Sequence, residues 1–396
     1  MPKITRHKPK PRSKSRLLST HNPLKNMSRN RLLPAIAGLA VAAVGIITLL
    51  TSRASTGPQK IEAEGGSRSG NIGVIADTTA SGGSYIIFKD QTTTTSQPPP
   101  SPGFSTTPGR VIPDTLYGVT TETIDNLSAL NASLTKHSKR PITRIVFQNK
   151  TTAPDYTVAV DNLRRTSYIM GEILDSTSLK SISVANYRAR TASFVNTYKN
   201  TIDIYEIGNE LNGEWVGTPS TILPKLQAAY DVVEKDNASL NLKSAITLNF
   251  WPSNDCYSYS WEDTESFANS IPLEIRNGTD YIFLSFYETA CSPRAKPTNE
   301  QFIAIFSKMK SIFPNAKIGM GEIGAQGKDD GLPTNPSLSE KQALANRYYG
   351  MHNALKASLG NRYVGGYFWW YYYQDAVPFN KLESLWPTIE ANFNTY

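Results

Sequence analysis

The sequence predicts an α/β protein whose main domain is a (β/α)₈ TIM barrel, preceded by a single transmembrane helix and a disordered linker. Two short apolar runs support the barrel, because each ends near a lone glutamate: IYEIGNE at residues 204–210 and KIGMGEIG at residues 317–324. Side chains at the carboxyl ends of parallel barrel strands line the mouth where chemistry takes place. Glu210 and Glu322 lie 112 positions apart, which leaves room for about three strand-helix units of roughly 30 to 40 residues. They therefore fit strands four and seven.

The positive charge of the chain is confined to its beginning. The net charge is +8, yet residues 1–53 carry eleven Lys and Arg and no acid, which leaves 30 basic and 33 acidic residues for the remainder. The main body is thus slightly acidic, and we expect no nucleic-acid partner for it. Residues 1–31 are interpreted as a basic cytosolic tail.

Residues 32–52 form an uncharged apolar stretch. At about 1.5 Å per residue, such a helix crosses a hydrocarbon core of roughly 30 Å. The basic flank places the N-terminus in the cytosol, so the rest of the chain is expected outside the cell membrane. The alternative is a cleavable signal peptide followed by secretion, because the small residues Ser52 and Ala54 offer a site where a signal peptidase can cut. The apolar core is longer, and the basic region before it more extended, than is typical of such peptides.

Residues 53–110 are expected to form an extracellular stalk. Within it, residues 59–90 resemble the opening strands of β-sandwich carbohydrate-binding modules, in their Glu-Ala-Glu start and Ala-Ser-Gly-Gly turn. A complete module needs on the order of 100 residues, so this piece is interpreted as a hairpin-like remnant. Residues 91–110 are rich in Thr and Pro, which favours an extended, solvated spacer.

From residue 111 to 396 the composition becomes that of a globular domain. Short apolar runs alternate with longer amphipathic segments, and a doubly wound open sheet is disfavoured because no glycine-rich phosphate loop follows the first strand. The expected strands are residues 116–120, 143–148, 168–174, 203–210, 243–249, 281–287, 316–322 and 364–370. The expected helices include residues 184–198, 219–235, 299–313 and 339–358.

Two strand-end carboxyl groups facing one another suit glycoside hydrolysis. A retaining enzyme needs them roughly 5 to 5.5 Å apart, one to protonate the leaving oxygen and the other to attack the anomeric carbon. Their surroundings must differ, so that near neutral pH one carboxyl is protonated and the other ionised.

The pair Asn209-Glu210 and the distant Glu322 resemble the strand-end residues of the clan A glycoside hydrolases, which are retaining β-glycosidases on a barrel fold. The resemblance implies that Glu210 is the acid/base, that Asn209 contacts the sugar 2-hydroxyl and that Glu322 is the nucleophile. Arg144 is similar to the strand-two arginine that keeps the nucleophile ionised, and Tyr287 to the strand-six tyrosine that hydrogen-bonds it. Ser285 departs from the histidine that several families carry there.

Aromatic residues are candidates for sugar binding. The resemblance implies a tryptophan under the reacting sugar at strand eight. Trp370 is expected to take this place, with Trp369 as the second choice, because alternation directs only one of two neighbours inward. Trp215 and Trp251 are candidates for the cleft wall, each with core packing as an equal alternative; Tyr257 and Trp261 stand beside them.

Other conspicuous acids are expected to be structural. Glu206 shares its strand face with Glu210, and it is interpreted as part of a polar layer paired with Arg144. Glu172 is a second candidate for this polar layer. Glu214 lies in an expected loop and is expected to be solvated.

The two cysteines, Cys256 and Cys291, follow expected strands five and six. Neighbouring loops bring them within disulfide range, which fits an oxidising exterior. The four histidines are scattered without ligand spacing, so no metal and no cofactor is expected.

We therefore predict a membrane-anchored, extracytoplasmic retaining β-glycosidase that acts as a monomer on a polysaccharide or oligosaccharide. The alternatives are a non-catalytic carbohydrate-binding surface protein on the same barrel, and an adhesin that would tolerate loss of both glutamates.

Overall fold

The computed structural model describes residues 72–76, 84–88 and 110–396. The expected basic tail, the expected membrane helix at residues 32–52 and the Thr/Pro-rich linker lie outside these residues. None of the helices in the described part combines the length and the apolar character needed to cross a membrane.

A small antiparallel hairpin lies within the segment that resembles a carbohydrate-binding module. Strand β1 (Ile72–Ala76) pairs with β2 (Ser84–Phe88), with Val74 opposite Ile86 at the centre. It belongs to a unit of the chain separate from the large domain.

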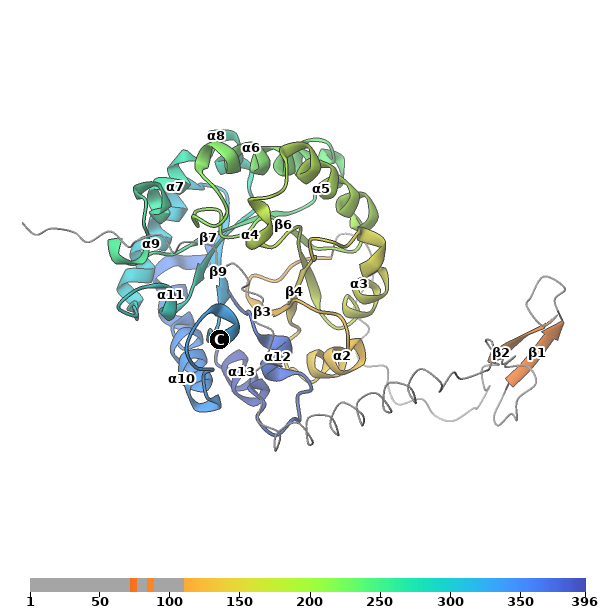
Figure 1. Ribbon diagram of the computed structural model, residues 1–396. Coiled ribbons are helices and arrows are strands. Elements are labelled where there is room, and N and C mark those ends of the chain that lie inside the picture. Colours follow the sequence, from red (N-terminus) through yellow and green to blue (C-terminus); the bar gives the residue numbers. More distant parts are fainter. Residues whose placement is uncertain (1–71, 77–83, 89–109) are drawn as a thin grey trace, which may run out of the picture. The chain divides into compact units, whose positions relative to one another are not determined.

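The large domain is a closed barrel of eight strands, as expected (Figure 1). All neighbouring strands are parallel, and the last strand pairs with the first. Each expected strand is present, with boundaries shifted by up to a few residues. The barrel strands are β3 (Leu116–Thr121), β4 (Ile142–Val146), β5 (Tyr168–Glu172), β6 (Ile204–Gly208), β7 (Ser244–Asn249), β8 (Tyr281–Phe286), β9 (Lys317–Ile323) and β10 (Tyr363–Trp369).

Helices surround the barrel on its outside (Figure 1). One expected helix, residues 339–358, is divided into α10 and α11 by a break at Gly350 and Met351, and α6 continues into a π-helical turn at Asp231–Lys235. The α-helices are α2 (Leu127–Thr135), α3 (Thr157–Leu163), α4 (Ser176–Leu179), α5 (Val184–Tyr198), α6 (Pro219–Tyr230), α7 (Thr264–Ser270), α8 (Leu273–Gly278), α9 (Asn299–Ile312), α10 (Leu338–Tyr349), α11 (His352–Leu359), α12 (Tyr372–Ala376) and α13 (Trp386–Phe393).

Side-chain caps define where several helices begin. The hydroxyl of Ser183 accepts a hydrogen bond from the Asn186 backbone N–H at the start of α5. Helix α10 begins with a capping box, in which Ser337 and Glu340 each accept from the other's backbone N–H. Such caps satisfy N–H groups that have no partner inside the helix.

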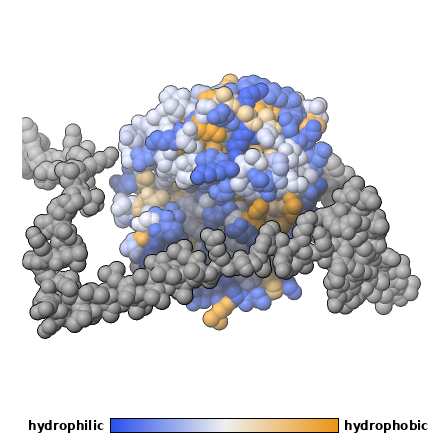
Figure 2. Space-filling view, turned by 45° about the vertical axis from the view of Figure 1, so that its right-hand side comes forward, coloured by the Kyte–Doolittle hydropathy of each residue, from blue (hydrophilic) through white to orange (hydrophobic). Residues whose placement is uncertain are grey.

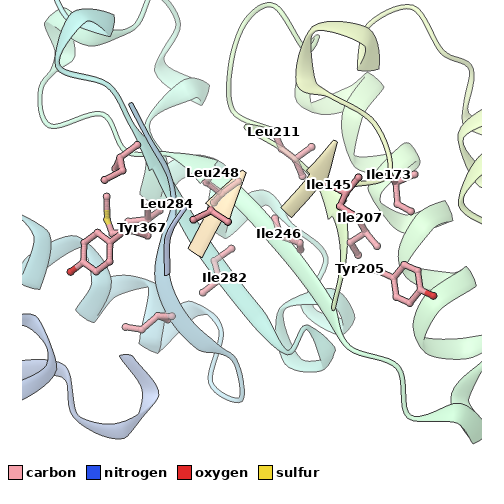
Figure 3. Packing of buried hydrophobic residues seen from close by; sticks show 14 of the residues in the cluster. Ile145, Ile173, Tyr205, Ile207, Leu211, Ile246, Leu248, Ile282, Leu284 and Tyr367 are labelled. Atoms are coloured by element: carbon pink, nitrogen blue, oxygen red, sulfur yellow. The ribbon is translucent and has the colours of Figure 1, made fainter. Parts of the chain in front are cut away.

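The outer faces of the strands pack against the helices. Residues at alternate positions, such as Tyr205 and Ile207 of β6 and Ile282 and Leu284 of β8, are fully buried in this layer (Figure 3). On the face of the domain that is visible in Figure 2, most of the surface is hydrophilic, and the apolar residues lie in small separate groups.

The barrel interior is layered along the strands. Its lower layer is apolar and contains Ile142, Met170, Ile204 and Phe283, among others. Side chains of a strand alternate between its faces, so the residue two positions further on points inward again, one layer higher. In that higher layer several of the inward-facing residues are charged instead of apolar, and they belong to the site described below.

Candidate active site

A cavity of about 610 Å³ opens at the carboxyl ends of the barrel strands. It is lined by residues at or near the ends of β6, β7, β8, β9 and β10 and by residues of the loops that follow β5, β6, β7, β8 and β9. The lining residues that matter most below are Asn209, Glu210, Tyr287, Glu322, Trp370 and Tyr371.

Glu210 follows the fourth strand of the barrel, as expected. Strand β6 ends at Gly208, and Glu210 has a φ of 50°, a left-handed conformation that a non-glycine residue adopts only when its surroundings impose it. Its carboxyl group accepts hydrogen bonds from two hydroxyls. Ser285 Oγ lies 2.6 Å from Oε1, and Ser176 Oγ lies 3.2 Å from Oε2.

Glu322 lies in β9, the seventh strand, also as expected. Tyr287 donates its hydroxyl to Glu322 Oε1 at 2.6 Å, and Arg144 Nη1 donates to Oε2 at 2.6 Å. Both contacts were anticipated by the resemblance. Ser285 donates to Glu210 and Tyr287 donates to Glu322. These two donors are alternate residues at the end of β8, so both carboxyl groups lie on the same side of that strand.

Arg144 is fully buried beneath the cavity and is shared by three glutamates. Its Nε donates to Glu206 Oε2 at 2.7 Å, and its Nη2 forms an ion pair with Glu172 Oε2 at 2.9 Å that lacks hydrogen-bond geometry. The expected polar layer in which Glu206 and Glu172 contact Arg144 is thus confirmed. Burial raises the pKa of Glu172 well above its usual value, with repulsion from Glu206 adding to the effect.

The environments of Glu210 and Glu322 differ in the way that acid/base chemistry requires. Burial, followed by the nearby charge of Glu322, raises the pKa of Glu210 to about 8. Burial also raises the pKa of Glu322, but the Arg144 guanidinium and the Tyr287 hydroxyl oppose that rise. Near neutral pH Glu210 therefore retains its proton, whereas the ionised form of Glu322 has two direct donors.

Two buried polar atoms of the cavity wall have no hydrogen-bond partner among the described residues. Asn209 donates from Nδ2 to Glu172 Oε1 at 3.1 Å, while its Oδ1 is unpaired. Trp251 Nε1 is a donor without an acceptor. Buried polar atoms are normally paired, so the cavity offers one acceptor and one donor to a polar ligand.

The aromatic candidates divide into two groups. Trp370, Trp215 and Trp251 line the cavity; the Trp370 ring lies over Arg144, with 5.2 Å between the guanidinium carbon and the ring centroid. Trp369 does not reach the cavity: it is fully buried and donates from Nε1 to Asp375. The second choice at strand eight was therefore wrong, because alternation turns Trp369 away. Tyr257 also lines the cavity, whereas Trp261 stacks on Tyr259.

The expected disulfide is present between Cys256 and Cys291, with their Cα atoms 4.2 Å apart. It joins the loops after β7 and β8, and Cys256 lies in the cavity wall. Among the residues that the structure describes, no group of His, Cys, Asp and Glu is arranged to hold a metal ion.

Sequence reasoning missed the two serines that contact Glu210. Ser285 was noted only as a departure from a histidine, and Ser176 was not singled out. Ser176 also accepts a hydrogen bond from Trp215 Nε1 at 3.1 Å, so it connects an aromatic wall residue to Glu210. The strand-end position of Ser285, two residues before Tyr287, was the one available signal.

Comparisons with known proteins identify similar structures but no sequence relatives. No family model and no curated protein matches the chain. A β-1,3-glucanase and allergen of Cryptomeria japonica pollen matches with a TM-score of 0.46 and 16% identity, over 65% of this chain and 89% of that one. A fungal β-1,4-galactanase matches at 0.41 and 16%, over 64% and 83%. A β-glucosidase from Exiguobacterium antarcticum matches at 0.43 and 8%, over 66% and 88%.

The contact between Ser285 and Glu210 leads to a first prediction. The Ser285 hydroxyl stabilises the ionised carboxylate and so lowers the pKa of Glu210. Ser285→Ala should therefore raise this pKa above about 8. A hydrogen bond to a charged group contributes about 1.5 to 3 kcal/mol. Losing it corresponds to a rise of about one to two in the pKa of Glu210.

Carbon-13 NMR titration of labelled glutamate side chains measures this value, with the Glu210 signal assigned by its loss in Glu210→Gln. Ser311→Ala, on the exposed side of α9, removes a hydroxyl far from the cavity and serves as the matched control. An unchanged or lower pKa in Ser285→Ala would show that the hydroxyl does not stabilise the carboxylate.

Proposed function

We propose that the barrel is a glycoside hydrolase that cleaves β-linked glycans with retention by a double displacement. The observation that carries the proposal is the pair of carboxyl groups in one cavity, of which Glu210 favours the protonated form and Glu322 is held by Arg144 and Tyr287. This is the division of labour that a retaining enzyme needs.

In the first step the Glu322 carboxylate attacks the anomeric carbon. The bond from that carbon to the leaving oxygen breaks, and the Glu210 proton moves to this oxygen, so a covalent glycosyl-enzyme forms and Glu210 becomes ionised. Protonation by a positioned acid contributes about 10² to 10⁴ in rate.

In the second step a water molecule attacks the same carbon. Glu210, now a carboxylate, takes a proton from the water, and the bond to Glu322 breaks. The carboxylate that leaves returns to its contacts with Arg144 and Tyr287, which stabilise its charge. Both groups are then in their starting states.

The unpaired wall atoms suit a sugar. Asn209 Oδ1 can accept a hydrogen bond from a sugar hydroxyl, which is the role that the clan A resemblance implies for this residue, and Trp251 Nε1 can donate to a sugar oxygen. The Trp370 ring and the edges of Trp215 and Trp251 provide apolar surfaces for the C–H faces of pyranose rings. The rings of Trp215 and Trp251 contact each other edge to face, with 6.4 Å between the ring centroids.

The central test replaces each glutamate separately in the full chain. We expect Glu210→Ala to lose about 10² to 10⁴ in kcat on unactivated glycans and Glu322→Ala to lose turnover almost completely, while binding persists. Hydrolysis of a panel of activated β-glycosides and a polysaccharide library measures both effects. Glu383→Ala, an exposed acid near the C-terminus, is the matched control.

Azide distinguishes the two roles. A small nucleophile should restore product formation in Glu322→Ala with inverted configuration, and in Glu210→Ala with retained configuration. If both variants keep full turnover, Glu210 and Glu322 are not catalytic. If the native protein binds glycans and never turns them over, it is a carbohydrate-binding protein on an enzyme-like barrel.

We further propose that residues 32–52 anchor the protein in the cell membrane with the barrel outside. The uncharged segment and its basic flank support this topology, and the disulfide suits an oxidising compartment.

For this topology we expect the full chain to sediment with membranes and to resist extraction by high salt. The barrel should be degraded when protease is added to intact cells. A deletion of residues 32–52 should abolish membrane retention. Recovery of a shortened barrel in the medium would instead support signal cleavage and secretion.

A further inference from the structure

The mouth of the cavity carries carboxylates from four separate loops. They belong to an acidic rim, which we define as Glu122, Asp175, Glu214, Asp329 and Asp330. Asp175, Glu214, Asp329 and Asp330 line the main cavity, and Glu122 lines an adjoining cavity of about 480 Å³. The two cavities have Asp329, Asp330, Trp370 and Tyr371 in common, so they adjoin, and we refer to them together as the groove.

Among the described residues, the acidic rim lacks paired counter-charges. No rim residue takes part in an ion pair within residues 110–396, and the main cavity has no Lys, Arg or His in its lining. The adjoining cavity includes Lys341, but that ammonium is paired with Asp375 at 2.6 Å. Arg144, below the floor, is already shared by three glutamates.

Neighbouring carboxylates repel the ionised form of Glu122. Burial raises the pKa of Glu122, and the charges of Asp175, Asp330, Glu322 and Asp329 raise it further. A negative field of this kind, focused by the low-dielectric walls of a groove, attracts cations and repels anions. The repulsion between carboxylates raises the free energy of the protein without a ligand, and a bound cation reduces this repulsion.

A second, independent observation points to a ligand that donates hydrogen bonds. The Asn209 side chain is 2% exposed and lines the same cavity. Its Nδ2 is engaged by Glu172, which leaves Oδ1 as an acceptor without a donor. A bound ligand can supply that donor, from either a hydroxyl or an ammonium group.

We propose that the groove selects glycans that carry free amino groups, as in polymers of 2-amino-2-deoxy sugars. This inference rests on the proposed function and names its substrate class. A hydroxyl satisfies the Asn209 acceptor but leaves the charges of the rim uncompensated, whereas an ammonium group satisfies an acceptor and also neutralises a carboxylate. Glycans that carry carboxylates or sulfates are rejected by the same field.

The test compares binding of polymers with the same β-1,4 backbone to the full-chain Glu322→Ala variant. The probes are chitosan oligomers with free amines, their fully N-acetylated counterparts and neutral cello-oligomers, at about pH 6, where chitosan carries a substantial positive charge and exposed carboxyl groups are ionised. We expect at least about tenfold tighter binding of the free amine, with most of that preference lost at high salt because ions screen surface charges.

Removing two rim charges should remove the preference. Glu122→Gln combined with Asp329→Asn should weaken amine-oligomer binding about five- to tenfold, as expected for two partly exposed ion pairs, and leave neutral oligomers unaffected. Asp161→Asn, on the exposed side of α3, removes a charge away from the groove and should change neither. Unaltered melting temperatures would show that the variants fold.

Each outcome is decisive for the inference. Equal or tighter binding of neutral or acetylated oligomers, or an amine preference that survives in the double variant, would overturn it. If the native protein hydrolyses neutral β-glycosides with retention and shows no amine preference, the substrate class fails while the proposed function stands. If amine binding is salt-sensitive but no glycan is ever cleaved, the proposed function fails and the rim remains a cation-selective site.

Discussion

The site depends on one buried guanidinium. Arg144 is enclosed by Glu172, Glu206 and Glu322, at a depth where a single uncompensated charge would cost several kcal/mol. Because one cation faces three carboxyl groups, charge balance favours protonation of at least one of them. Burial, with repulsion from Glu206, raises the pKa of Glu172 and so favours its protonated form. Glu322 faces both this cation and the cavity.

The barrel layering explains how the cluster is held. An apolar layer fills the lower interior, and the inward positions directly above it carry Arg144, Glu172 and Glu206 in adjacent strands. Glu322 approaches from β9 across the interior. Packed strands restrict all of these side chains, so the donors to Glu322 are preorganised, which is what electrostatic stabilisation of a reacting carboxylate requires. Glu210 lies higher, after its strand has ended, and is reached by two serines instead of a cation.

Much of this arrangement follows from sequence patterns. The apolar runs predicted all eight barrel strands, and the period-two alternation predicted that Glu206 would pair with Arg144. The pairing of Cys256 with Cys291 followed from loop order alone. These features are local, or depend only on the order of strands around a barrel, so a single sequence contains enough information to predict them.

Other features depend on tertiary contacts and could not be predicted from patterns. The left-handed backbone at Glu210 is imposed by the turn after β6, and no residue type there signals it. Ser176 meets Glu210 only because the loop after β5 folds over the mouth. The interruption between α10 and α11 falls within a continuous amphipathic pattern, so the expected single helix over residues 339–358 was too long.

The central claim is that one carboxyl group of the pair is protonated while its partner is ionised. Neutron diffraction from deuterium-exchanged crystals at about pH 7, below the pKa of about 8 for Glu210, observes this directly. The account predicts a deuterium on a carboxyl oxygen of Glu210 and none on Glu322, whose oxygens face the deuterated Tyr287 hydroxyl and the Arg144 guanidinium. A deuterium on Glu322, or two bare carboxylates, would contradict it.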